Sequence, residues 1–164
     1  MYQKIADASA PKELSTLLIP VKGSHLILPN VTIAEIISRV QVAGVDDVPN
    51  WFVGFIQWRK REVPIVLFEA INDQPFAAAQ NQQKHIAIVN GGNAKTPFWG
   101  LLTEATPRSI RLTKDQIIAS KAVIAGPAEL QRVSANETAA IIPDLNYIED
   151  KIVALMAELK AQTG

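Results

Sequence analysis

Short apolar runs that alternate with turn signals are the feature that most constrains the fold of this chain. Residues 15–28 contain two such runs around Lys22-Gly23-Ser24, and residues 51–68 contain two more around the charged segment 59–62. Turn signals recur about every 8–12 residues, which is the spacing of a β-sandwich or β-barrel. With 164 residues the chain is also long enough to bury a core without a metal or a disulfide. We therefore predict a mainly β fold.

The other segments divide into expected strands, loops and one undecided region. Residues 84–90 are expected to form a strand, and the segment 90–93 (Asn-Gly-Gly-Asn) is a tight-turn signal because these residue types tolerate positive φ. The apolar pattern of residues 31–40 fits either a short helix or a bent strand. Residues 1–14 are mixed and polar, and we expect a loose segment there.

The C-terminal segment 144–162 has the periodicity of an amphipathic helix. Its apolar residues follow one another at helical spacing and therefore share one face: Ile148, Ile152, Leu155, Met156 and Leu159. Asp144 or Asn146 is expected to cap the first turn. Such a face more often covers a core than binds a partner helix, so we expect it to pack on the body of the protein.

Composition and charge exclude several classes of function. The chain has no cysteine, which removes disulfide scaffolds, thiol nucleophiles and zinc-finger ligand sets. Its 16 basic residues balance 16 acidic ones, so bulk charge does not favour nucleic acid or an anionic membrane. Neither His25 nor His85 lies in a catalytic or metal-binding motif, and we expect no catalytic residue, no metal and no cofactor. The absence of a signal peptide and of an apolar run of about 18 residues predicts a cytoplasmic protein.

The most unusual cluster of side chains is Trp58-Arg59-Lys60-Arg61, at the expected turn of a hairpin. An aromatic ring next to three cations can stack on nucleic-acid bases, but the zero net charge favours a merely solubilising hairpin tip over that use. Arg and Trp at an exposed hairpin are also typical of protein–protein hot spots. We favour this third interpretation.

Three segments of the chain resemble the CheW-like domain, the adaptor fold of bacterial chemosensory arrays. Residues 28–37 (LPNVTIAEII) resemble the family's apolar-Pro-Val…Val-x-Glu-Val segment, and residues 49–56 (PNWFVGFI) resemble its loop-to-strand entry with a glycine. The most specific match is residues 54–68 (GFIQWRKREVPIVLF), which resemble Gly-Val-Ile-Asn-Leu-Arg-Gly-x-x-Val-Pro-Val-x-Asp-Leu. The likeness extends over residues 15–160, strongly to Ile71 and weakly afterwards.

The resemblance implies a single domain, residues 15–162, built from two SH3-like five-stranded β-barrels with an apolar seam between them. We expect the first barrel to comprise about residues 30–83. The second is expected to comprise about residues 84–142 together with the N-terminal hairpin. Short helices and the C-terminal helix 144–162 complete this expected architecture.

The resemblance also implies a function. The family members it points to are non-catalytic adaptors that couple the regulatory domain of a CheA-type histidine kinase to the cytoplasmic tip of methyl-accepting chemoreceptors, without binding nucleic acid or inserting into the membrane. The Trp58-Arg59 pair and the Phe68-Glu69 ending resemble the ChpC-type branch, which accompanies systems that govern type IV pili and twitching motility.

The matching positions supply a set of implied partner-binding residues: Glu35, Gly54, Trp58, Arg59, Lys60 and Val63. Glu35 and Arg59 are expected to pair across the first barrel, while strand-interior packing is an equally good explanation of Gly54. Lys60 departs from the family's turn glycine, which costs about 1–2 kcal/mol if the turn needs positive φ. Leu67 departs from an acidic residue.

Two other functions stay open on the sequence alone. A barrel that binds a small ligand would need a sizeable apolar pocket with a few convergent polar groups. An RNA-binding barrel would show a steep fall in affinity with added salt.

Overall fold

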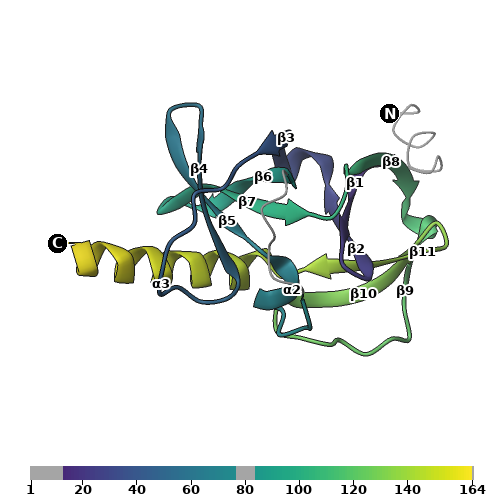
Figure 1. Ribbon diagram of the computed structural model, residues 1–164. Coiled ribbons are helices and arrows are strands. Elements are labelled where there is room, and N and C mark those ends of the chain that lie inside the picture. Colours follow the sequence, from purple (N-terminus) through teal and green to yellow (C-terminus); the bar gives the residue numbers. More distant parts are fainter. Residues whose placement is uncertain (1–12, 77–83, 164) are drawn as a thin grey trace.

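The computed structural model describes residues 13–76 and 84–163, which form two curled β-sheets and a long C-terminal helix (Figure 1). The six-stranded sheet takes its strands from both ends of the chain, and we call it the terminal lobe: β1 (Glu13–Val21), β2 (Ser24–Pro29), β8 (Arg108–Thr113), β9 (Ile117–Ala119), β10 (Glu129–Ala135) and β11 (Thr138–Pro143). The five-stranded sheet is the central lobe: β3 (Ile33–Val40), β4 (Phe52–Trp58), β5 (Arg61–Val66), β6 (Lys84–Asn93) and β7 (Thr96–Thr103). The predicted mainly β, two-barrel class is confirmed.

The two lobes follow one plan. The strand order is β8-β1-β2-β11-β10-β9 in the terminal lobe and β3-β6-β7-β5-β4 in the central lobe. In each lobe two antiparallel hairpins meet through one parallel contact, β2 with β11 and β7 with β5. In each lobe a helix also follows that contact, α3 (Leu145–Thr163) after β11 and the short α2 (Phe68–Ile71) after β5. Two 3-10 turns, η1 (Asn30–Thr32) and η2 (Lys114–Gln116), complete the elements.

The boundary between the lobes differs from the one predicted. Residues 84–103 belong to the central lobe, whereas we expected the second barrel to begin at residue 84. The reason is the parallel contact of β5 with β7, because parallel strands cannot be joined by a tight turn and need a crossover. The chain after β5 makes that crossover through α2 and β6, so β6 and β7 pair back into the same sheet. The N-terminal hairpin lies in the other sheet, with β8 and β11.

Two local predictions are resolved by irregularities in the strands. Residues 33–40 form a strand whose pairing with β6 shifts at two places, and these shifts break the apolar alternation that would have identified it. The segment 90–93 is not the predicted tight turn: β6 continues to Asn93 through a bulge, and the turn falls at Ala94 and Lys95. Residues 13 and 14 belong to β1, and the rest of the predicted loose segment lies outside the described residues.

The core consists of two lobe interiors and a seam between them. One cluster fills the central lobe, with residues such as Ile56, Ile65 and Ile86, and another fills the terminal lobe. A third and larger cluster spans the seam, where Ile19 and Leu26 of the terminal lobe meet fully buried residues of the central lobe. The apolar seam implied by the resemblance is therefore present.

Helix α3 ties the lobes together. Asp144 caps it, since its Oδ1 accepts a hydrogen bond from the backbone N–H of Tyr147 at 3.1 Å. Ile148 and Ile152 are fully buried in the seam cluster, which confirms that this face covers the core. Buried Glu149 accepts hydrogen bonds from the Gly92 N–H at 2.9 Å and from Trp99 Nε1 at 3.2 Å, and so holds the helix to β6 and β7. None of the helices in the described ranges is long and apolar enough to span a bilayer.

Candidate protein-interaction site

The β4–β5 hairpin carries most of the residues that the sequence singles out. Its strands pair up to Trp58 and Arg61, which leaves Arg59 and Lys60 as the turn residues. Their φ angles are 49° and 62°, both in the left-handed region, as a two-residue turn of type I′ requires. Lys60 therefore adopts, at a conformational cost, an angle that glycine adopts freely. The turn matches the twist of the strands and gives the hairpin a defined tip.

Glu35 of β3 meets the tip of this hairpin. Its Oε1 accepts hydrogen bonds from Arg59 Nη2 at 3.1 Å and from Trp58 Nε1 at 3.2 Å, which confirms the expected Glu35–Arg59 contact. The Arg59 side chain is 65% exposed and that of Glu35 is 40% exposed. A pair this exposed adds less than about 1 kcal/mol of stability. Its effect is instead to hold the planar guanidinium in one orientation at the surface.

The Arg59 guanidinium also contacts an aromatic ring. The Arg59 guanidinium lies 4.5 Å from the centroid of the Trp58 ring, and Trp58 packs against Phe98 of β7 with 5.0 Å between centroids. On the far side of this pair, Arg61 lies 5.3 Å from the Phe98 ring centroid. Near the hairpin tip, two guanidinium groups thus each lie over an aromatic ring, and the two rings contact each other at a tilt of 60°.

Only half of the implied partner-binding residues reach the surface. Arg59 and Lys60 are exposed and Glu35 is partly exposed. Trp58, which we expected at an exposed hairpin, is only 6% exposed, and Val63 is 1% exposed. Both side chains belong to the core cluster of the central lobe. Burial alternates along β4, which places Trp58 on the inward face, and Val63 begins the continuously buried part of β5. Trp58 and Val63 can therefore act on a partner only by supporting the exposed residues.

Gly54 is fixed by a close approach of two backbones. Its φ is 145°, and a Cβ at this position would lie 2.1 Å from the carbonyl oxygen of Ala43. Ala43 and Phe55 exchange backbone hydrogen bonds of 2.9 and 3.0 Å, which hold the loop before β4 against the strand. Gly54 is buried, so the structure gives it the packing role that was the alternative to a direct contact.

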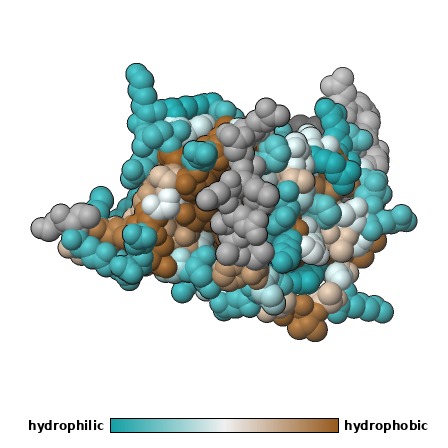
Figure 2. Space-filling model, viewed as in Figure 1, coloured by the Kyte–Doolittle hydropathy of each residue, from teal (hydrophilic) through white to brown (hydrophobic). Residues whose placement is uncertain are grey.

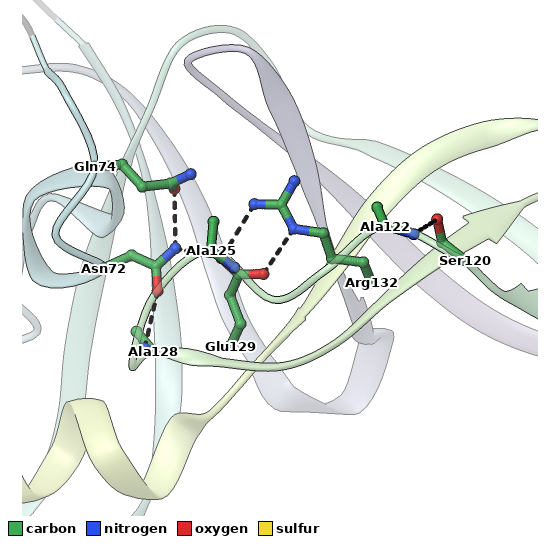
Figure 3. A network of polar contacts seen from close by, with 8 residues as sticks. All are labelled: Asn72, Gln74, Ser120, Ala122, Ala125, Ala128, Glu129 and Arg132. Atoms are coloured by element: carbon green, nitrogen blue, oxygen red, sulfur yellow. Dashed lines mark hydrogen bonds and ion pairs between the residues drawn. The ribbon is translucent and has the colours of Figure 1, made fainter.

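A buried polar network that was not predicted from the sequence joins the lobes (Figure 3). Asn72, at the end of α2, donates through Nδ2 to Glu129 Oε2 at 2.6 Å and accepts at Oδ1 from the backbone N–H of Ala128 at 2.9 Å. Arg132 donates through Nε and Nη2 to the two Glu129 oxygens at 2.8 and 3.1 Å. Glu129 and Arg132 are three residues apart, which is the only local signal of the pair.

The environment of Glu129 favours its charged form. Burial raises the pKa of this carboxyl, but the hydrogen bonds from Arg132 and Asn72 outweigh burial and lower the pKa below its ordinary value. The lobes approach so closely here that a Cβ on Gly126 would lie 1.9 Å from the carbonyl oxygen of Asn72. The network therefore fixes the two lobes relative to each other.

Glu69 is a further buried carboxylate near the seam, with fewer hydrogen-bond partners than Glu129. Glu69 of α2 is 3% exposed, and its Oε2 accepts a hydrogen bond from the backbone N–H of Lys22 at 3.1 Å. Its Oε1 has no hydrogen-bond partner in the described part of the protein. Burial accordingly raises the pKa of Glu69 above its ordinary value.

The ring of His85 lies between two hydroxyl groups. His85 Nδ1 lies 2.8 Å from Ser38 Oγ and its Nε2 lies 3.4 Å from Thr106 Oγ1, so both ring nitrogens face hydroxyl groups at the surface. Within residues 13–76 and 84–163, no three acidic or histidine side chains lie close enough together to hold a metal ion.

An exposed apolar surface lies at the opposite end of the molecule. It is formed by side chains on β9, on β10 and on the loop between them: Ile118, Val123, Ile124 and Leu130, of which Val123 is 85% exposed. Figure 2 shows apolar surface at the lower right, below the terminal lobe. Sequence reasoning missed this surface, because apolar residues in a β-rich chain are normally assigned to the core.

Comparison with known proteins agrees with this geometry. The CheW-like domain profile matches residues 15–152. No curated protein matches the chain in sequence. Among solved structures, the chain is similar in fold to the crystal structure of the scaffolding protein TtCheW from Thermoanaerobacter tengcongensis. The TM-score is 0.67 and the sequence identity is 15%, over 84% of this chain and 88% of that one. The chain belongs to the CheW-like domain family.

Proposed function

We propose that this protein is a non-catalytic scaffold in a bacterial chemosensory system, where it couples a CheA-type histidine kinase to chemoreceptors. Family membership supports this proposal, as does the fold shared with a protein described as a scaffold. The kinase is expected to contribute its regulatory domain, and the receptor its cytoplasmic tip.

The observation that carries the proposal is the fixed, exposed guanidinium of Arg59. A scaffold needs no group that changes its protonation state, but it needs anchors whose orientation is set before the partner arrives, because ordering a long side chain during binding costs affinity. The contacts of Arg59 with Glu35 and Trp58 meet that requirement. The remaining N–H groups of the guanidinium are available to a carboxylate or a carbonyl of a partner.

The distribution of surfaces also suits a protein that holds two partners. The Glu35–Arg59 contact lies at the tip of the β4–β5 hairpin of the central lobe, and the exposed apolar side chains around Val123 lie in and beside the loop between β9 and β10 of the terminal lobe. The polar network at the seam would keep the two surfaces at a constant separation. We expect one partner at each surface.

Reconstitution from purified components tests the proposal. The full chain is mixed with the regulatory domain of a CheA-type kinase, with a receptor cytoplasmic fragment, or with both, and the products are separated by size-exclusion chromatography. We expect two binary complexes and one ternary complex. Failure to bind either partner would overturn the proposal, and binding of one partner alone would reduce it to a single-partner module.

A finer assignment, to the ChpC-type branch, rests on the Trp58-Arg59 pair and the Phe68-Glu69 ending. It predicts that deletion of the gene reduces twitching motility mediated by type IV pili while swimming is retained. Normal twitching in the deletion strain would remove this assignment and leave the scaffold proposal intact.

A further inference from the structure

A groove on the central lobe adjoins the β4–β5 hairpin. It is bounded by β4 and β5, by the turn between β6 and β7, and by the last turns of α3, and it encloses about 480 Å³. Figure 2 shows apolar surface gathered between the hairpin and the far end of α3. The volume is within the range of about 300–1,000 Å³ that is typical of ligand pockets.

The floor of the groove offers side chains rather than backbone groups. Phe55, Phe98 and Met156 are half-buried there, and the two prolines Pro64 and Pro97 have no N–H to donate. The strand beneath, β5, already has neighbours on both sides, β7 and β4. A partner therefore cannot bind here by adding a strand to a free sheet edge, whereas a helix can bind through its side chains alone.

The rim of the groove has an excess of positive charge. Its charged residues are Arg61, Lys95, Lys160 and Glu62, in a chain whose total charge is zero. Arg61 and Lys95 are exposed, and the Arg61 guanidinium is held at the edge by its contact with the Phe98 ring. This local imbalance favours an acidic occupant.

We propose that this groove binds an amphipathic helix of a partner protein, with the apolar face of the helix on the floor and acidic residues flanking that face. The partner is thereby specified by its chemistry: apolar residues at helical spacing with Asp or Glu on both sides. Arg61 and Phe98 line the groove whereas Glu35 and Arg59 do not, so this contact can be tested whether or not the proposed scaffold function is correct.

Designed peptides test the chemistry of the occupant. The first is a helical peptide of about 14 residues with leucines at i, i+3, i+4 and i+7 and flanking glutamates. The second replaces the glutamates with lysines, and the third replaces the leucines with serines. Fluorescence anisotropy should show that the first binds about tenfold more tightly than either of the others, and that added salt weakens its binding. Equal binding of the glutamate and lysine peptides, or no binding of the first, would overturn the proposal.

Charge reversal locates the contact on the protein. The double variant Arg61→Glu with Lys95→Glu changes exposed side chains and should weaken binding of the glutamate peptide about tenfold without changing the melting curve. The matched control is Lys114→Glu with Lys121→Glu, which reverses two exposed cations of the terminal lobe and should leave binding unchanged. Unaltered binding by the first variant would contradict the assignment. Sedimentation gives a second test: if the protein forms a dimer through these residues and the dimer does not bind the peptide, the proposal is also contradicted. The occupant of the groove would then be a second copy of the chain.

Discussion

Two carboxylate–guanidinium contacts in this protein differ mainly in burial. Glu35 and Arg59 meet at the tip of a hairpin, where their side chains are 40% and 65% exposed. Glu129 and Arg132 meet at the seam between the lobes, where the exposed fractions are 0% and 23%. The N···O distances are similar, 3.1 and 2.8 Å.

The difference shows that the same chemistry serves two purposes. At the seam, Glu129 accepts hydrogen bonds from Arg132, Asn72 and the backbone of Ala125, so its carboxylate oxygens already have hydrogen-bond donors within the protein. A buried charge that loses such partners is costly, which makes this contact structural. At the hairpin, most of the Arg59 donors face solvent, so the contact contributes little stability and keeps the group ready for a partner.

The largest effect is expected from Glu129→Ala. This change leaves the Arg132 guanidinium and the Asn72 amide without their shared acceptor at the seam, so we expect the free energy of unfolding to fall by about 3 kcal/mol. Urea denaturation followed by circular dichroism measures it. The control is Glu62→Ala, an exposed acid on β5, which should change stability by less than about 0.5 kcal/mol. Equal effects of the two substitutions would show that burial does not distinguish the contacts.

The pH dependence of stability should reveal two buried carboxyls with opposite signs. The folded-state pKa of Glu129 is lowered below 4.5 by its hydrogen bonds despite burial, so its contribution is present above pH 4.5 and is lost as pH falls through the folded pKa. The folded-state pKa of Glu69 is raised above 4.5 by burial, so its contribution is present below pH 4.5 and is lost as pH rises through the folded pKa.

Melting curves across the pH range check these signs. Glu69→Gln should be more stable than wild type at neutral pH and should remove part of the loss of stability above pH 4.5. Glu129→Gln should remove part of the loss of stability below pH 4.5. If Glu69→Gln were less stable than wild type at neutral pH, the carboxylate would be satisfied in the fold and the argument from burial would be wrong.

A smaller effect is expected at the hairpin turn. Lys60 has a φ of 62°, so Lys60→Gly relieves backbone strain in the folded state, while the greater entropy of glycine in the unfolded state partly offsets that gain. The free energy of unfolding should therefore rise by about 0.5–1 kcal/mol. Thermal denaturation measures the change. Lys95→Gly is the matched control in the turn between β6 and β7, because Lys95 does not have a positive φ and glycine should lower stability there. A loss of stability in Lys60→Gly would contradict the turn geometry.

Sequence reasoning predicted the elements whose signals are local. The β4–β5 hairpin follows from a charged segment between apolar runs, and α3 follows from its periodicity and its cap at Asp144. The Glu35–Arg59 contact was predicted from family positions, and the two side chains do meet, at 3.1 Å.

Long-range features were not predicted, for identifiable reasons. The assignment of β6 and β7 to the central lobe depends on the parallel contact of β7 with β5, and no residue pattern in the intervening sequence indicates such a contact. Trp58 precedes three charged residues and was therefore expected to be exposed, yet the alternation of side chains along β4 points it toward the core. The contact between Asn72 and Glu129 joins residues 57 positions apart, and neither side chain lies in a recognisable pattern.

The most direct test of the account is to measure stability and partner binding together in Arg59→Glu. We expect the melting curve to stay close to that of wild type, because the exposed pair contributes less than about 1 kcal/mol, while affinity for the kinase regulatory domain or the receptor tip falls at least about tenfold. Isothermal titration calorimetry of this variant next to Lys114→Glu, an exposed charge reversal on the terminal lobe, gives the comparison. A folded Arg59→Glu variant that binds both partners as tightly as wild type would contradict the central claim, as would a variant that fails to fold.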